Sequence, residues 1–135
     1  MALRRTELLN VQSVTGIATV GIFTVGVTNT AGPVGVASTT YVRSIVMHNT
    51  GIGTARTSLY IYPSSTSSPV TGAGITAHRI LRIDLAPNET TFFETNYPIV
   101  LTDRDKIVVE VNVPDSGGTG IGSAVNFLIN GDTDI

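Results

Sequence analysis

The sequence contains no cysteine and no tryptophan, two histidines, and one lysine, Lys106. Without cysteine the chain can form no disulfide, zinc–thiolate site or thiol nucleophile. Charged residues make up 13% of the 135 positions, against about 25% in an ordinary globular chain. The formal net charge is −2, so the composition favours neither nucleic acid nor an anionic membrane as a partner.

Long apolar runs are also missing. Arg4 and Arg5 precede an apolar stretch with small residues, an arrangement that is typical of an export signal. However, Glu7, Asn10 and Gln12 interrupt its start, and threonines and glycines punctuate the rest. A membrane-spanning helix needs about 20 predominantly apolar residues. We therefore expect neither an export signal nor a membrane span.

What the sequence does contain is apolar and small polar residues. Hydrophobic residues reach 41% and the mean hydropathy is +0.27. One domain of this length can bury a substantial core. With so few charges, much of its surface must be threonine, serine, asparagine and glycine, and part of the apolar surface is expected to meet a partner. Because closed symmetry is usual in such assemblies, we expect a homo-oligomer, with a trimer favoured.

Short β-branched segments alternate with loops rich in glycine, proline and asparagine, which is typical of β-strands. Residues 41–49 and 55–62 predict a hairpin, with Arg43 on the same face as Ile45. The alternation is clearest over residues 79–85, where the expected inward face is Leu81, Ile83 and Leu85 and the outward face is Ile80, Arg82 and Asp84. The pattern predicts about eight strands, and hence an all-β, antiparallel β-sandwich or jelly roll.

The N-terminal segment has a different pattern. Glycines recur every five residues at Gly16, Gly21 and Gly26, so the β-branched residues between them lack the steady alternation that one sheet requires. We therefore expect an extended N-terminal arm over residues 1–30 and a β-sandwich domain over residues 31–135. Such an arm would gain part of its order from a neighbouring subunit.

The titratable side chains are sparse. His48 and His78 would need to converge with a carboxylate to form a metal or acid–base site, and nothing in their spacing brings them together. Acidic residues that could supply oxygen ligands for calcium are Asp103, Asp105, Asp132 and Asp134. They lack the glycine and the distal acid of a calcium loop, so a hairpin turn is the favoured interpretation.

The glycine-rich stretch GGTGIG, residues 117–122, superficially resembles a phosphate-binding loop. Such a loop requires a helix after it, whereas the β-rich segment 125–129 follows here. No serine lies in a nucleophile motif either. The sequence therefore predicts no catalytic, cofactor-binding or metal-binding residue, and we expect a protein that is not an enzyme.

Aromatic residues leave two interpretations open. Tyrosine rings can stack on the C–H faces of sugars, and four are available: Tyr41, Tyr60, Tyr62 and Tyr97. Core or interface positions are the favoured interpretation, because a buried tyrosine needs only one hydrogen-bond partner.

Residues 42–113 resemble a set of small virion proteins of tailed bacteriophages. The matching pieces are Asn49–Thr50, Leu59–Tyr60, Leu85–Pro87–Glu89–Thr90, Pro98 to Leu101 and Asp105–Ile107–Val109. More loosely, the segment TGIATVGIFTVG is similar to stretches in structural and fibre proteins of marine cyanophages. The chain departs from the pattern in its longer N-terminal segment and in Arg104, where glycine is commoner.

This resemblance implies a structural protein of the virion, most simply a capsid decoration (cement) protein that bridges neighbouring subunits of the major capsid protein. The alternative is a head–tail, neck, tail accessory or fibre protein with a glycan-binding surface, carried by Tyr60, Tyr62 and loops 63–77 and 114–122. Neither hypothesis involves nucleic acid, a membrane or a cofactor. The residues that we expect at an interface are Arg4, Arg5, Ile17, Val20, Ile22, Phe23, Val25, Tyr60 and Tyr62.

Overall fold

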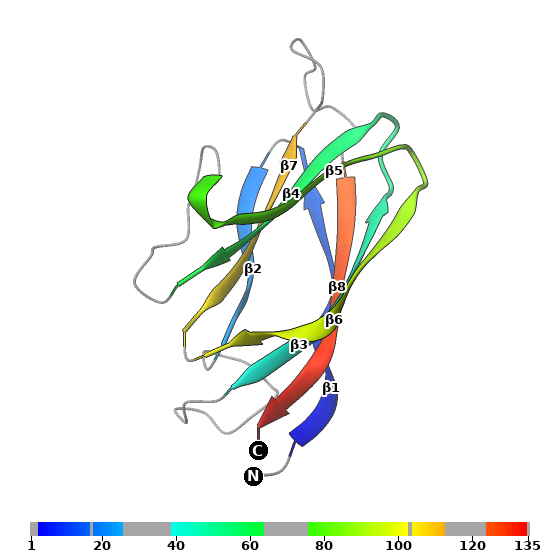
Figure 1. Cartoon of the computed structure of the whole chain (residues 1–135). Coiled ribbons are helices and arrows are strands. Elements are labelled where there is room, and N and C mark those ends of the chain that lie inside the picture. The colour runs from blue at the N-terminus through cyan, green and yellow to red at the C-terminus, as the bar shows by residue number, and fades with distance from the viewer. Residues whose placement is uncertain are drawn as a thin grey trace.

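The computed structural model describes residues 3–16, 18–25, 39–63, 76–102, 104–112 and 124–134. These residues form one short 3₁₀ helix, Thr76–His78, and eight strands (Figure 1). The strands are β1 Leu3–Thr15, β2 Ala18–Thr24, β3 Thr40–Asn49, β4 Ala55–Tyr62, β5 Arg79–Leu85, β6 Thr90–Leu101, β7 Lys106–Asn112 and β8 Ala124–Asp134. Within these described segments, no helix has the length and hydrophobicity needed to cross a membrane.

The strands form two antiparallel sheets of four, in the orders β1-β8-β3-β6 and β2-β7-β4-β5 (Figure 1). Among these pairs, only β4 and β5 are consecutive in the chain. This interleaving of early and late strands across two sheets is the arrangement of an eight-stranded jelly roll. The all-β sandwich prediction is therefore confirmed, and the strand order selects the jelly roll.

The predicted hairpin of residues 41–49 and 55–62 is wrong in its pairing. Both strands exist, but β3 lies in one sheet and β4 in the other. The loop between them crosses from sheet to sheet, so it is a connection between layers rather than a tight turn within one sheet.

The core lies between the sheets and is built from the inward faces of the strands. The buried residues alternate along the later strands and include Ile107, Val109 and Val111 on β7 and Val125, Phe127 and Ile129 on β8. The faces predicted for β5 are confirmed. Leu85 is fully buried, Leu81 and Ile83 are half-buried against the core, and the alternate positions 80, 82 and 84 are exposed.

The predicted N-terminal arm is wrong for the part of residues 1–30 that the structure describes. Strand β1 pairs with β8 along its length, and β2 pairs with β7. Leu8, Val14 and Phe23 belong to the buried core. These two strands are therefore part of the sandwich, one in each sheet, and the boundary near residue 30 does not separate an arm from it.

The glycine repeat in this segment has a local explanation. Gly16 has a φ of 73°, a left-handed conformation that glycine adopts without steric cost, and it lies where the chain passes from β1 to β2. Gly21 borders a register shift between β2 and β7. Such a bulge moves the following side chains to the other face, which accounts for the missing alternation. Gly26 lies outside the described residues.

A bulge also changes the faces of β3. The pairing with both neighbours shifts between Val42 and Ser44, and relative to β8 Arg43 is the extra residue. As a result Val42 and Ile45 share the buried face, and Arg43 is exposed. The prediction that Arg43 lies on the face of Ile45 is therefore wrong, because strict alternation does not survive a bulge.

Candidate functional site

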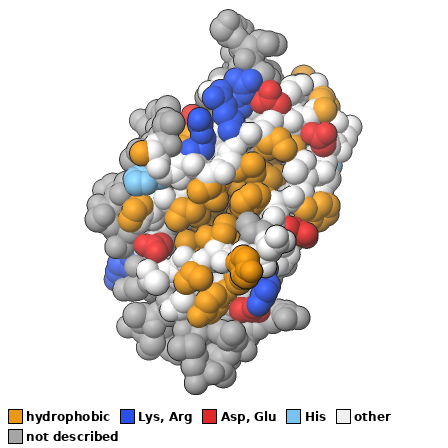
Figure 2. All heavy atoms as spheres, in the orientation of Figure 1, with side chains coloured by type: hydrophobic (Ala, Val, Ile, Leu, Met, Phe, Trp, Pro, Cys, Tyr) orange, Lys and Arg blue, Asp and Glu red, His pale blue; other side chains and the backbone are white. Residues whose placement is uncertain are grey.

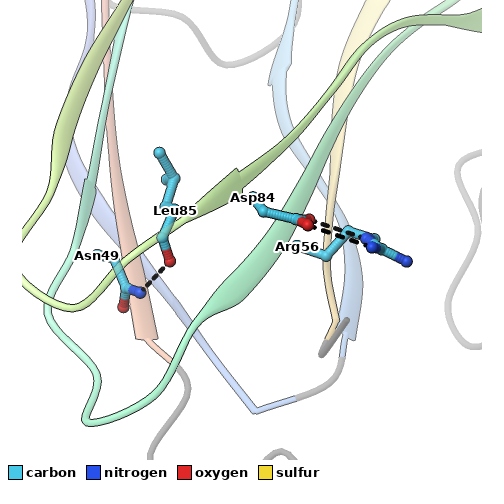
Figure 3. Close-up of polar contacts among 4 residues, drawn as sticks. All are labelled: Asn49, Arg56, Asp84 and Leu85. Carbon is cyan, nitrogen blue, oxygen red and sulfur yellow. Dashed lines mark hydrogen bonds and ion pairs between the residues drawn. The ribbon is translucent and has the colours of Figure 1, made fainter. Parts of the chain in front are cut away.

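Asn49, at the end of β3, connects the two sheets. Its side-chain Nδ2 donates hydrogen bonds of 2.9 Å to the carbonyl oxygens of Leu85 and Gly53, and its Oδ1 accepts one of 2.8 Å from the backbone N–H of Gly51. The bond to Leu85, on β5, is drawn in Figure 3. Asn49 is fully buried. Because a buried amide must satisfy its polar atoms, this residue fixes the loop between β3 and β4 and the end of β5 together.

The backbone of Asn49 also holds the turn between β5 and β6. Its N–H donates to the carbonyl of Glu89 at 3.0 Å, and its carbonyl accepts from the N–H of Asn88 at 2.8 Å. Asn88 has a φ of 62°, which asparagine tolerates better than most residues. Asn49 and the turn of residues 86–89 therefore meet at one junction, where β5 ends and β6 begins.

Strands β5 and β6 are edge strands of opposite sheets and lie on the same side of the sandwich (Figure 1). We call this the β5–β6 side and define it by residues 79–85 and 90–101. In the described part of the chain it carries four of the six large apolar side chains that are well exposed, Ile80, Phe92, Tyr97 and Val100. In Figure 2, hydrophobic side chains gather in a band between these strands.

Between the two edges the core itself is only partly covered. Leu81 and Ile83 on β5, and Phe93 and Ile99 on β6, pack against the core but remain half-exposed. A neighbouring molecule on this side would cover this margin of the core, which Ile80 and Phe92 border from the outer faces of the two sheets. Burial of such surface stabilises an association by about 25 cal/mol per Å².

Strand β6 is irregular at its exposed edge. Its pairing with β3 passes from Ser44–Glu94 to Val42–Ile99, so residues 95–98 of β6 lie opposite the single residue Arg43. Pro98 lies within this wide bulge, where its missing N–H costs no ladder hydrogen bond. Tyr97 lies there too, with 84% of its surface exposed. Bulges and prolines of this kind prevent an edge strand from pairing with another strand.

In each sheet, described residues of neighbouring strands form an ion pair. Arg56 on β4 donates from Nε and Nη2 to the two carboxylate oxygens of Asp84 on β5, at 2.8 and 3.2 Å (Figure 3). The hydrogen bond from Arg56 lowers the pKa of Asp84 below its ordinary value. On the other sheet, Nε of Arg43 lies 2.6 Å from Oδ2 of Asp132, whose side chain is almost completely buried.

Tyr60 and Tyr62 form a second, smaller buried cluster with Val108, on the outer face of the β2-β7-β4-β5 sheet. Their rings meet edge to face at 6.1 Å, and the imidazole of His78 lies 5.5 Å from Tyr62. The hydroxyl of Tyr60 donates to Oε1 of Glu110 at 2.6 Å. Burial, and then this bond to Glu110, raises the pKa of Tyr60 above its ordinary value.

The interface prediction for Tyr60 and Tyr62 is therefore wrong. Their exposed fractions are 1% and 0%, so neither ring offers a face to a sugar or a partner. The reason is that β4 lies inside its sheet, between β7 and β5, and both of its faces are covered.

On β2 and directly after it, the predictions for Ile22, Phe23 and Val25 are also wrong, whereas that for Val20 stays a prediction. Ile22, Phe23 and Val25 are buried in the core, and Val20 is half-buried against it. Arg4 and Arg5 pair through their backbones with Thr133 and Asp132, while their side chains, like the whole of Ile17, lie outside the described residues. The exposed apolar residues of β6 were missed, although adjacent Phe92 and Phe93 carry a signal, since one of two neighbouring strand residues must face outwards.

The two histidines lie in, or beside, different sheets of the sandwich. Nδ1 of His48, on β3, lies 2.7 Å from Oγ1 of Thr90, whereas His78 packs beside β4 in the other sheet. Asp105 accepts hydrogen bonds from the N–H and the hydroxyl of Thr102, the turn interaction that the sequence favours. Over the described segments, no three histidine or acidic residues gather as a metal site. Asp103, the side chain of Asp134, loop 114–122 and most of loop 63–77 lie outside the described residues.

Comparison with known proteins gives limited likeness. No protein-family profile matches the chain, and no curated protein matches it. Two solved structures of infectious bursal disease virus are similar. The Gt strain matches with 10% identity and a TM-score of 0.42, over 98% of this chain and 32% of that one. The Gx strain matches with 8% identity and a TM-score of 0.30, over 98% and 39%. The chain thus spans about a third of each viral chain.

Proposed function

We propose that this chain is a structural protein of a virion that binds its neighbours through the β5–β6 side. The observation that carries the proposal is the half-covered core margin between β5 and β6, whose two strands also carry the exposed Ile80, Phe92, Tyr97 and Val100. Jelly rolls are frequent in viral capsids, although a fold by itself does not determine a function. The role is mechanical rather than catalytic, and surface burial supplies its free energy.

More specifically, we propose a capsid decoration protein of a tailed bacteriophage, located on the particle as a homo-oligomer, with a trimer favoured, and bound to the major capsid protein. The resemblance of residues 42–113 to small phage virion proteins supports this assignment. Each copy would bridge neighbouring subunits. At about 25 cal/mol per Å² of buried apolar area, a modest contact repeated over the shell resists the pressure of the packaged genome.

The second candidate is a tail accessory or fibre protein with a glycan-binding surface. One observation favours it, namely the 84% exposure of Tyr97 on the β6 bulge. An exposed tyrosine ring can stack on a sugar. In this case a glycan array should give hits that Tyr97→Ala removes, whereas a decoration protein should give none.

The test of the virion role uses particles of the virus that encodes the chain, prepared with and without its gene. Mass spectrometry of purified particles should detect the chain, and a reconstruction should place its density on the shell. Purified protein added back to deficient particles should raise the temperature at which the genome is released. Absence of the chain from intact particles would overturn the proposal.

Two variants test whether the protein binds particles through the β5–β6 side. Phe92→Glu places a charge on the β5–β6 side and should abolish binding to deficient particles. Val11→Glu is the matched control. Val11 is 60% exposed and Phe92 is 62% exposed, but Val11 lies on β1, at the opposite edge of the β1-β8-β3-β6 sheet. Equal binding by both variants would exclude the β5–β6 side as the contact.

A further inference from the structure

Residues 81–85 read Leu-Arg-Ile-Asp-Leu, a segment that is complementary to itself. When two copies run antiparallel with Ile83 opposite Ile83, each Leu81 lies opposite a Leu85 and each Arg82 opposite an Asp84. Directly opposite side chains in an antiparallel pair interact, and opposite charges stabilise the pair. The segment therefore has the pattern of a strand that pairs with its own copy.

The structure places this segment where such pairing is feasible. Strand β5 is the edge of its sheet, and no described strand is hydrogen-bonded to its other side. Arg82 and Asp84 point to the solvent face, and the inward Leu81 and Ile83 are only half-buried. An edge strand presents a row of unpaired N–H and C=O groups, which is a template for another strand.

We propose that β5 of one copy pairs antiparallel with β5 of a second copy about a two-fold axis at Ile83. The two β2-β7-β4-β5 sheets then form one continuous sheet across the dimer, and the half-exposed Leu81 and Ile83 of both copies are covered. Each Asp84 keeps its bond to Arg56 and also faces Arg82 of the other copy, because a carboxylate has acceptor sites for both.

Charge fixes the register of this contact. A slip that brings Arg82 opposite Arg82 of the second copy, or Asp84 opposite Asp84, places like charges directly across from each other, which is destabilising. A slip by an odd number of residues mismatches the inward and outward faces. The register centred on Ile83 avoids both penalties.

The other three edge strands are less suited to such pairing. Strand β6 carries the wide bulge with Pro98, β1 has two register shifts, and β2 has one near Gly21. Strand β5 has a shift of its own, but it falls at Ile80, outside the regular segment 81–85. The contact uses only the β5 part of the β5–β6 side. Because it is two-fold, it is compatible with the proposed trimer only in an even-numbered assembly such as a hexamer. A failure of this contact would leave the virion role itself in place.

Charge reversal tests the contact with the whole chain. Wild-type protein at tens to hundreds of micromolar should sediment as a dimer, or as an even-numbered assembly. Arg82→Asp and Asp84→Arg should each weaken the two-fold contact by about tenfold or more, since each creates two like-charge pairs. Mixing the two variants restores both opposite-charge pairs, so a heterodimer should form. A monomeric wild type, or assembly unchanged in both variants, would overturn the proposal.

A cross-link gives a second measurement. Because the chain has no cysteine, Ile83→Cys introduces a single thiol at the axis. Directly opposite Cα atoms in an antiparallel pair lie about 4.5 to 5.5 Å apart, within disulfide reach. Mild oxidation should therefore give a covalent dimer. Ile52→Cys, at a loop position that is 83% exposed, is the control. Equal cross-linking at both positions would indicate random collision and refute the pairing.

Discussion

The side-chain amide of Asn49 donates a 2.9 Å hydrogen bond to the carbonyl oxygen of Leu85, 36 positions away and in the opposite sheet. Asn49 also bonds to Gly53 and Gly51, so one buried amide determines both the loop after β3 and the position of β5. Because β5 ends and β6 begins at this junction, Asn49 determines the position of the β5–β6 side.

Asn49→Ala should therefore lower the free energy of unfolding by about 2 to 3 kcal/mol, since buried hydrogen-bonding groups lose their partner. Urea denaturation measures the loss. Thr50→Ala is the control, because its hydroxyl makes one exposed hydrogen bond of 3.2 Å to Ala124 and its removal should cost less than about 1 kcal/mol. Similar losses in both variants would show that Asn49 does not hold the sheets together.

Gly131, on β8, lies against its neighbouring strands so closely that no side chain fits. A Cβ there would collide with the backbone carbonyl oxygen of Tyr41 on β3, and it would lie 2.9 Å from Cδ1 of Leu8. Gly131→Ala must therefore push β3 and β8 apart, and we expect a loss of about 3 kcal/mol or more.

The control for this prediction is Gly53→Ala. A Cβ at Gly53 meets nothing within 4 Å, so stability should stay within about 0.5 kcal/mol of wild type. Thermal denaturation of the two variants compares them directly. A Gly131→Ala protein as stable as wild type would mean that the sheet relaxes there without strain.

Strand faces could be predicted wherever alternation continues without interruption. On β7 the two-residue period places Ile107, Val109 and Val111 in the core, as the sequence indicates. It fails at Arg43 and near Gly21, because a bulge depends on the partner strand as much as on the bulged residue. The local sequence does not show which strand is the partner.

The pairing of the strands and the exposure of their outward side chains could not be predicted from the sequence for a related reason. A jelly roll joins strands distant in the chain, so β3 and β4 separate although they are neighbours in sequence. Tyr60 and Phe92 show the consequence for the site. Each lies on a face that alternation predicts to point outwards, but Tyr60 is 1% exposed on an inner strand and Phe92 is 62% exposed on an edge. Tyr60 packs among Tyr62, Val108 and Glu110, which the fold brings together from β4 and β7.

The N-terminal strands give a direct test of their place in the core. Val14, on β1, is 4% exposed, whereas Val11 on the same strand is 60% exposed. Val14→Asp should prevent folding, because it buries an unpaired charge at a cost above about 4 kcal/mol. Val11→Asp should change stability by no more than about 0.5 kcal/mol. Circular dichroism measures whether each variant is folded. A folded Val14→Asp protein would mean that β1 is not required for the core and would support the predicted N-terminal arm.

The last prediction concerns alkaline stability and Tyr60. Burial and the bond to Glu110 raise the pKa of its hydroxyl in the folded protein, whereas in the unfolded chain it titrates near 10. Above that pH the unfolded state releases a proton that the folded state retains, so stability must fall as the pH rises. Below it this contribution is fully present, and it disappears as the pH rises through the folded pKa.

The measurement is the free energy of unfolding from urea titrations at pH 8 and at pH 10.5, for wild type and for Tyr60→Phe. The variant should be less stable at pH 8, by about 1 kcal/mol for the lost hydrogen bond, and its stability should fall less between the two pH values. The other three tyrosines are common to both proteins, so they cancel in the comparison. Glu110→Gln should give an intermediate fall, because it removes the charge that opposes ionisation but leaves the burial. An identical pH dependence in all three proteins would mean that another group controls the alkaline transition.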